Sequence, residues 1–323
     1  MSGNLGSQWL PDSPVIEEVT VRSENTDHSD PDTQIMPMGR GRLTFRRFMR
    51  NKLAVVGVIV LVVMVLAAVV GPHLWHWDYL QIDNKAFLKP PSGSHPLGTT
   101  ASGRDVLAML LFGMRKSLMI GIIYALLVTA IETLAGAAAA YFGAWVERLI
   151  LWITDLLLIV PQLLLVAIIM WGQVSPKWSW LFLAILMGVL DWPMGGRIVR
   201  SLTISLKNRE YVQAARFMGL SSWRIIFRHI LPNISSLLIV NVTMGVGLAI
   251  LAETTYAYLG FGVQPPDISL GALIADGSTK ATTFPWEFGF GALALVIVVL
   301  AVNAIGDGLR DALDPTSMAG GQA

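Results

Sequence analysis

Four acidic residues stand inside long apolar runs of this 323-residue sequence: Glu132, Asp155, Asp191 and Glu253. A carboxylate near the centre of a bilayer costs on the order of 2.5–3.5 kcal/mol on insertion scales, so each is expected to face protein or water. Such carboxylates could line a translocation path, relay protons or hold helices together. For Glu132 and Glu253 both the path and the packing interpretations stay open.

The other two acids have basic residues near them in the sequence. Asp155 follows Arg148 by seven residues, which places both on the same face of a helix, and Asp191 precedes Arg197. We therefore expect Asp155 and Asp191 to serve helix packing, with these arginines as candidate partners.

No motif of enzymatic chemistry occurs in the sequence. None of the seven lysines follows a glycine, so the Gly-Lys-Ser/Thr phosphate loop is absent, as are Gly-x-Ser-x-Gly and His-Glu-x-x-His. There is no cysteine, which excludes thiol catalysis and cysteine-ligated metal. His73 and His76 have no further histidine nearer than His95, so we interpret them as solvated polar residues. We therefore expect no catalytic, cofactor-binding or metal-binding residue.

Residues 210–232, EYVQAARFMGLSSWRIIFRHILP, form a polar and basic stretch between apolar segments. Helical spacing places four of them on one face of a short helix: Tyr211, Ala214, Ala215 and Met218. The alanines would let the backbone of another protein come close. Gly219 is placed to end this helix, and Ser221 or Ser222 to cap the next.

A second short helix is expected to follow. The apolar residues expected on one of its faces are Trp223, Ile226, Phe227 and Ile230. Arg224 and Arg228 would lie elsewhere, and Pro232 would end the helix. The pattern favours a segment that docks a partner protein; the alternative is a surface loop whose apolar residues lie on lipid headgroups.

The composition of the sequence indicates a membrane protein. Hydrophobic residues make up 54% of the sequence and charged residues 14%, far from a soluble domain. Because about 20 apolar residues in a helix cross the hydrocarbon, we predict an all-α membrane protein. Its six transmembrane helices are expected near residues 53–71, 117–143, 149–171, 178–199, 234–262 and 288–306. Arg115 and Lys116 predict an interfacial helix before the second span, with these bases among headgroups.

The basic residues predict the orientation of the chain. Of the 23 Lys and Arg, 16 fall on the side of the N-terminus, which places both termini and a loop over 200–232 in the cytoplasm. Residues 1–39 carry seven acids against one base, so we expect 1–40 to be a disordered acidic tail. A membrane domain over 41–316 and a short cytoplasmic tail over 317–323 would follow.

The spacing of Ala214-Ala215, Gly219 and Leu231-Pro232 resembles the EAA loop of permease subunits in ATP-binding-cassette (ABC) importers. Gln213 stands where the family usually has an acid. Elsewhere the chain is similar to the C-type permease of dipeptide/oligopeptide importers, a family that includes nickel importers. The similar stretches, in order, are RRFMRNKLA (46–54), HPLGTTASGRDVL (95–107), LGFGVQPPDISLGALIADG (259–277) and GDGLRDALDP (306–315). Thr100 replaces an acid usual after the Leu-Gly-Thr of the second stretch.

The resemblance implies the type I importer permease fold in a bacterial inner membrane. The chain would form half of a peptide path with a second, different permease. ATPase subunits would bind ATP and Mg, and an extracytoplasmic binding protein would deliver the peptide. The residues that the resemblance assigns to ATPase coupling are Glu210, Tyr211, Gln213, Ala214, Ala215, Arg216, Met218, Gly219, Arg224, Leu231 and Pro232.

Three alternatives stay open beside this interpretation. The first is a permease for nickel or another small solute, because related permeases share these motifs. The second is a proton-coupled secondary transporter that uses Glu132 and Glu253, although the sequence shows no internal repeat of the kind expected there. The third is a membrane scaffold whose cytoplasmic loop recruits soluble proteins without transport.

Overall fold

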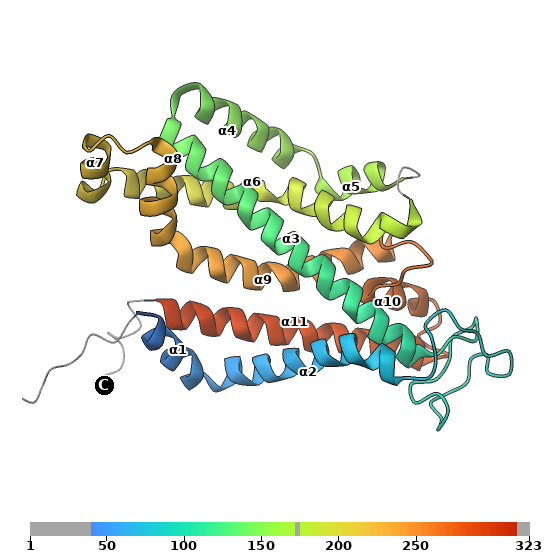
Figure 1. Cartoon of the computed structure of the whole chain (residues 1–323). Helices are drawn as coiled ribbons and strands as arrows, with labels where there is room; N and C mark the ends of the chain where they lie inside the picture. The colour runs from blue at the N-terminus through green and yellow to red at the C-terminus, as the bar shows by residue number, and fades with distance from the viewer. Residues whose placement is uncertain (1–39, 172–174, 315–323) are drawn as a thin grey trace, which may run out of the picture. The chain divides into compact units, whose positions relative to one another are not determined.

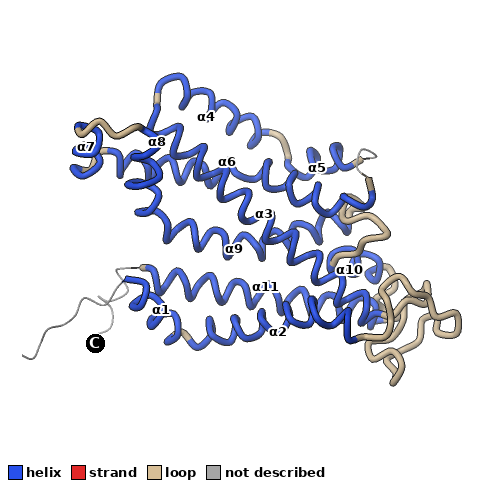
Figure 2. Tube along the Cα trace, in the orientation of Figure 1, coloured by secondary structure: helices blue, strands red, loops and turns tan. Residues whose placement is uncertain are grey.

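The computed structural model describes residues 40–171 and 175–314, and everything below concerns this part of the chain. The acidic tail expected over 1–40, apart from Arg40, and the tail expected over 317–323 lie outside the described residues. Figures 1 and 2 show that the described residues form helices and connecting loops. The helices are α1 (Arg40–Arg50), α2 (Lys52–Leu74), α3 (Val106–Phe142), α4 (Ala144–Ile159), α5 (Gln162–Met170), α6 (Ser179–Lys207), α7 (Glu210–Phe217), α8 (Ser222–Ile225), α9 (Leu231–Tyr258), α10 (Leu270–Ser278) and α11 (Pro285–Leu313).

Polar side chains begin several of these helices by accepting hydrogen bonds from free backbone N–H groups. The Ala54 N–H donates to Asn51 Oδ1 at 3.2 Å at the start of α2. The Ala108 N–H donates to Asp105 Oδ1 at 2.7 Å at the start of α3, and Ser269 caps α10 in the same way. Such caps satisfy donors that the helix leaves unpaired.

Among the described residues, five helical stretches are long and apolar enough to cross a membrane: 52–74, 106–142, 176–207, 222–258 and 285–313. The pair α4 and α5 makes a sixth if it counts as one span. The chain is thus an all-helical protein with five or six candidate membrane spans.

The span expected near 149–171 is not one straight helix. The axes of α4 and α5 differ by 83°. Val160 between them has φ −83° and ψ 126°, an extended conformation. Pro161 explains the break, because its ring disfavours helical geometry in the preceding residue and it has no N–H to donate.

The prediction of a separate interfacial helix before the second span is wrong, because α3 runs without a break from Val106 to Phe142. Lys116 Nζ lies 3.0 Å from Asp267 Oδ2 and 4.5 Å from the centre of the Trp180 ring. For Lys116 the protein itself therefore provides the counter-charge, whereas Arg115 is exposed.

Helix α3 is the central helix of the bundle, and it packs on α6, α9, α2 and α10. Small residues allow its closest approaches: a Cβ on Gly136 would lie 2.4 Å from the Gly196 carbonyl oxygen of α6. On α9, a Cβ on Gly245 would lie 3.2 Å from the Ala125 Cβ of α3. Glycine at such crossings brings helix backbones close together.

The described part of the chain has two distinct ends in Figure 1. The segment of α7 and α8 lies at one end, together with α1 and the C-terminal end of α11. The long loop between α2 and α3 lies at the other end, near α10. Candidate functional residues occur at both ends and between them.

Candidate functional site

Helix α7 packs on the end of the bundle through one face, beside the point where α6 is bonded to α3. Lys207, the last residue of α6, donates from Nζ to the carbonyl oxygens of Ala140 (3.1 Å) and Tyr141 (3.0 Å). These are among the last carbonyls of α3, which favour a cation. Val212 and Ala215 of α7 are 2% and 1% exposed and pack in an apolar cluster with Ala137, Val199, Ile225, Ile226, Ile230 and Ile234.

The opposite face of α7 is open. Tyr211 is 42% exposed, Met218 72% and Phe217, which the sequence did not single out, 89%. The structure separates the alanine pair, because Ala214 is exposed whereas Ala215 is buried. The expectation that both alanines face a partner is therefore wrong for Ala215, which seats the helix instead.

The other residues assigned to coupling lie at the surface. Leu231 is half-buried, and the exposed ones are Glu210, Gln213, Arg216, Gly219, Arg224 and Pro232. Gln213, at the position of the usual acid, donates from Nε2 to the Asn208 carbonyl at 3.2 Å. In this chain that side chain therefore binds the end of α6.

Two clefts border α7. One, of about 860 Å³, lies between α7 and the ends of α3 and α6, and its wall includes Tyr141, Lys207, Gln213, Arg216 and Phe217. The other, of about 640 Å³, is lined by Leu206, Asn208, Arg209, Glu210, Tyr211 and Asn233. A protruding helix with a cleft on either side is suited to receive a folded partner.

Gly219 ends α7 as the sequence predicts, with a left-handed φ of +79°. Ser221 stands at the N-cap of α8, but its side chain accepts no capping hydrogen bond. The prediction that Pro232 ends the second helix is wrong. α8 continues through a π-helical turn (Ile226–Ile230) into α9, and Pro232 lies in the first turn of α9, where proline is tolerated.

The faces of this second helix also differ from the prediction. Ile226 and Ile230 are buried, whereas Trp223 and Phe227 are 48% and 55% exposed. The wider π-helical turn changes the angle between successive side chains, so a pattern drawn for 3.6 residues per turn fails. The Trp223 ring lies 5.4 Å from that of Phe142 at the end of α3.

Glu253 lies in a closed polar network between α3, α9 and α10. It is fully buried, and its carboxylate accepts from Ser269 Oγ at 2.5 Å and Ser117 Oγ at 3.3 Å. Ser117 Oγ in turn accepts from the Leu270 N–H at 3.0 Å, and the Gly271 N–H also donates to Glu253. The acid thus fastens the start of α10 to two long helices.

Glu132 has a comparable place between α3, α9 and α6. It is 5% exposed and accepts from Asn241 Nδ2 at 3.0 Å. Its carboxylate occupies the space beside Gly195, where a Cβ would lie 1.5 Å from Glu132 Oε2. Glycine at 195 is what makes room for this acid.

The remaining two acids are bonded, but not to the partners suggested by the sequence. Asp155 forms an ion pair with Arg197 of α6, so the candidate partner Arg148 is wrong. Asp191 accepts from the Tyr124 hydroxyl at 2.6 Å rather than pairing with Arg197. Both contacts join different helices, in agreement with a role in helix packing.

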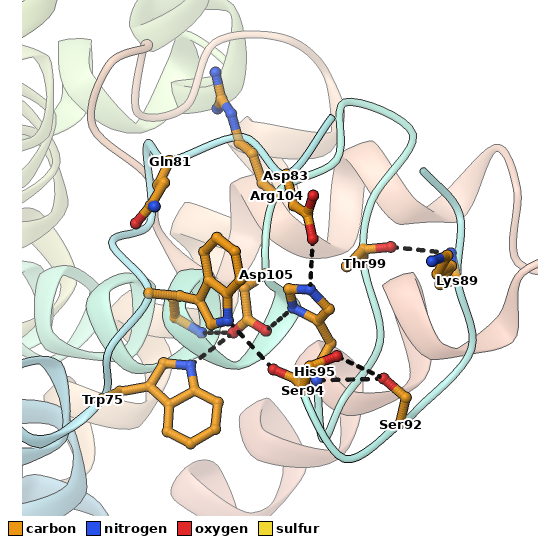
Figure 3. Close-up of polar contacts among 12 residues, drawn as sticks. Trp75, Gln81, Asp83, Lys89, Ser92, Ser94, His95, Thr99, Arg104 and Asp105 are labelled. Carbon is orange, nitrogen blue, oxygen red and sulfur yellow. Dashed lines mark hydrogen bonds and ion pairs between the residues drawn. The ribbon is translucent and has the colours of Figure 1, made fainter. Parts of the chain in front are cut away.

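A polar cluster that the sequence did not single out orders the loop at the other end of the bundle (Figure 3). His95, 1% exposed, has Nδ1 2.7 Å from Asp105 Oδ2 and Nε2 3.4 Å from Asp83 Oδ2. The Trp75 indole donates to Asp105 Oδ1 at 3.1 Å. The Lys85 backbone N–H, and then His95, hold the pKa of the Asp83 carboxyl below its usual value. Asp105 therefore joins the end of α2 to the start of α3.

The chain belongs to the family of binding-protein-dependent transport system inner membrane components, whose profile matches residues 132–317. Residues 39–91 match the N-terminal TM domain of oligopeptide transport permease C. The resemblance predicted from the sequence is thus confirmed. As an inner-membrane permease component the chain is not the catalytic subunit; its system includes an ATPase, which binds ATP, and a binding protein.

Curated relatives cover most of the chain. It is 46% identical to the oligopeptide transport system permease protein OppC of Mycobacterium tuberculosis, over 86% of this chain and 95% of the relative. It is 38% identical to OppC of Bacillus subtilis, over 83% and 87% respectively. It is 36% identical to the dipeptide transport system permease protein DppC of Alkalihalophilus pseudofirmus, over 88% and 93%.

Proposed function

We propose that this chain is one of two different permeases that together form the peptide path of an ABC importer. The names of the relatives, oligopeptide and dipeptide permeases at 36–46% identity over more than four fifths of the chain, support the substrate class. The extracytoplasmic binding protein would deliver a dipeptide or oligopeptide to the end of the bundle that carries the loop between α2 and α3.

The contact with the ATPase would lie on the exposed face of α7 and the start of α8. The observation that carries this assignment is the division of α7 into two faces. Val212 and Ala215 fix the helix to the bundle, while Tyr211, Phe217 and Met218 remain exposed beside open clefts. A helix fixed on one side can transmit a force that a partner applies to the other. This end of the bundle, with α1, would face the cytoplasm.

Glu132 and Glu253 would serve the path by holding the helices that border it. Each carboxylate is bonded to side chains of other elements, which accounts for its burial without a substrate. A proton relay is a weaker explanation, because the hydrogen bonds of Glu253 form a closed set inside the chain.

The test is uptake of labelled peptide into vesicles that contain the purified complex. The binding protein is added outside, and ATP is enclosed in the lumen, which takes the place of the cytoplasm. We expect labelled peptide to accumulate only when both are present. Accumulation that follows a proton gradient without ATP would contradict an ATP-driven importer, and uptake of nickel in place of peptide would contradict the substrate class.

Coupling is tested by Gly219→Trp. The new side chain has open space here, but the left-handed φ of +79° strains any residue other than glycine, so assembly is judged against a control with the same strain. The new bulk should obstruct the ATPase contact and leave ATP hydrolysis without uptake. Gly260→Trp is the matched control, since Gly260 also follows a helix, has a φ of +86° and faces open space near the other end of α9. Normal uptake by Gly219→Trp would overturn the assignment.

A further inference from the structure

Helix α1 has two faces of different chemistry. Its inner face packs on α11: a Cβ on Gly308 would lie 3.2 Å from the Phe48 ring, and Arg47 Nη1 lies 3.4 Å from the Asp314 carbonyl oxygen. Asn51, which follows α1, donates from Nδ2 to Asp311 Oδ2 at 3.4 Å. These contacts fix the orientation of α1 and therefore decide which residues point outward.

The outer face carries a row of bases beside a row of apolar side chains. Arg42, Arg46 and Arg50 recur every four residues and are all exposed, and none has a carboxylate within ion-pair distance among the described residues. Phe45 and Met49, also four residues apart, are 65% and 50% exposed. A helix with this pattern suits an interface between water and hydrocarbon.

The apolar row leads directly into an exposed apolar surface of α2. Leu53 and Val56 at the start of α2 are 68% and 53% exposed, and α2 is a candidate membrane span. With α2 across the membrane, Phe45 and Met49 would lie where the hydrocarbon begins, and the arginines would lie at the depth of phosphate groups. Three bases without a carboxylate partner among the described residues would favour anionic over zwitterionic headgroups at that depth.

We propose that α1 is an interfacial helix that binds acidic phospholipid in the leaflet on the side of α7. The arginine row would bind the phosphates, Phe45 and Met49 would enter the acyl region, and the inner face would remain on α11. Acidic lipid would thereby hold the α2–α11 pair in place. This inference goes beyond the transported substrate and does not depend on it.

Because the chain has no cysteine, a cysteine introduced by substitution is the single labelling site on it, and the labelled chain is tested within the whole complex. A nitroxide on Met49→Cys is compared in vesicles of phosphatidylcholine with and without phosphatidylglycerol, by its collisions with oxygen and with a neutral, water-soluble nickel chelate. We expect the ratio of oxygen to nickel collisions to rise severalfold when phosphatidylglycerol is present. The same label on Lys85→Cys, in the loop at the other end, should stay accessible to the chelate in both vesicles.

The arginines are tested by combining R42Q, R46Q and R50Q, which should abolish the effect of phosphatidylglycerol on the Met49 label. The combination of K85Q, K89Q and K177Q removes the same charge elsewhere and should leave the effect intact. A label that meets the chelate freely in both vesicles would overturn the proposal. So would a label protected from both reagents only when the ATPase subunits are bound, because α1 would then be a protein contact.

Discussion

At the scale of single residues, the Glu253 carboxylate is the acceptor for three buried donors, two serine hydroxyls and one backbone N–H. Glu253→Ala would leave the Ser117 and Ser269 hydroxyls and the Gly271 N–H without their acceptor. Each buried group left unpaired costs about 1–3 kcal/mol, so the melting temperature of the chain in detergent should fall clearly.

Thr255→Ala is the control for this prediction. Thr255 lies on the same helix but is exposed, and its hydroxyl bonds only to the Leu251 carbonyl of its own helix, at 3.1 Å. Its removal should change the melting temperature little. Equal melting temperatures for the two variants would show that the network around Glu253 does not stabilise the fold.

Asp83 gives the loop between α2 and α3 a defined response to acid. The pKa of Asp83 is lower in the folded chain than in the unfolded chain, so the ionised carboxylate stabilises the fold at pH values above the unfolded pKa. This stabilisation is lost as the pH falls through the lower, folded pKa. The loop should therefore loosen in acid, below about pH 4. Proteolysis of the loop against pH would show this, and Asp83→Asn should remove that part of the pH dependence.

Residue identity alone could not have revealed these networks. The sequence marked Glu253 as unusual but gave no means of finding Ser117, its partner 136 positions away. It also offered no partner for His95, because Asp83 and Asp105 become its neighbours only in the folded loop. The one local signal was Asp105 just before a long apolar helix, the position of an N-cap.

At the scale of elements, the two alanines of α7 should behave differently. Ala215→Leu adds bulk to a packed cluster, which typically costs about 1–3 kcal/mol, so it should lower the stability of the chain itself. Ala214→Leu places the same bulk on the exposed face. It should leave the melting temperature unchanged but reduce recovery of the ATPase with the tagged chain. Full recovery with Ala214→Leu would contradict docking on this face.

The apolar periodicity of residues 210–232 predicted a short helix correctly but not how that helix connects to the next. The apolar spacing and Gly219 were sufficient for α7, because a helix and its left-handed end are local features. They were not sufficient beyond Ser222, where a π-helical turn carries the chain through Pro232 into α9. The span expected near 149–171 failed for the opposite reason. Its hydropathy predicts one continuous helix, but Pro161, which separates α4 from α5, is a local signal that the sequence already contains.

At the scale of the whole molecule, the orientation can be tested with the same cysteine-free background. A cysteine at Phe217, on α7, should react with a membrane-impermeant reagent only after the cells are opened. A cysteine at Lys85 should react in intact cells, or in spheroplasts if an outer membrane is present. The reverse pattern would contradict the placement of α7 in the cytoplasm, which rests on the excess of Lys and Arg at that end.

The continuity of α8, the π-helical turn and α9 has a mechanical consequence. Residues 222–258 form one unbroken helical segment that begins beside α7, changes direction near the π-helical turn and ends near α10 (Figure 1). Glu253 bonds the far part of this segment to Ser269 at the start of α10. Because no residue of this segment leaves helical geometry, a displacement at one end is passed on through continuous backbone hydrogen bonds. A displacement of Trp223 by a partner should therefore reach α10, at the other end of the bundle, through this single segment.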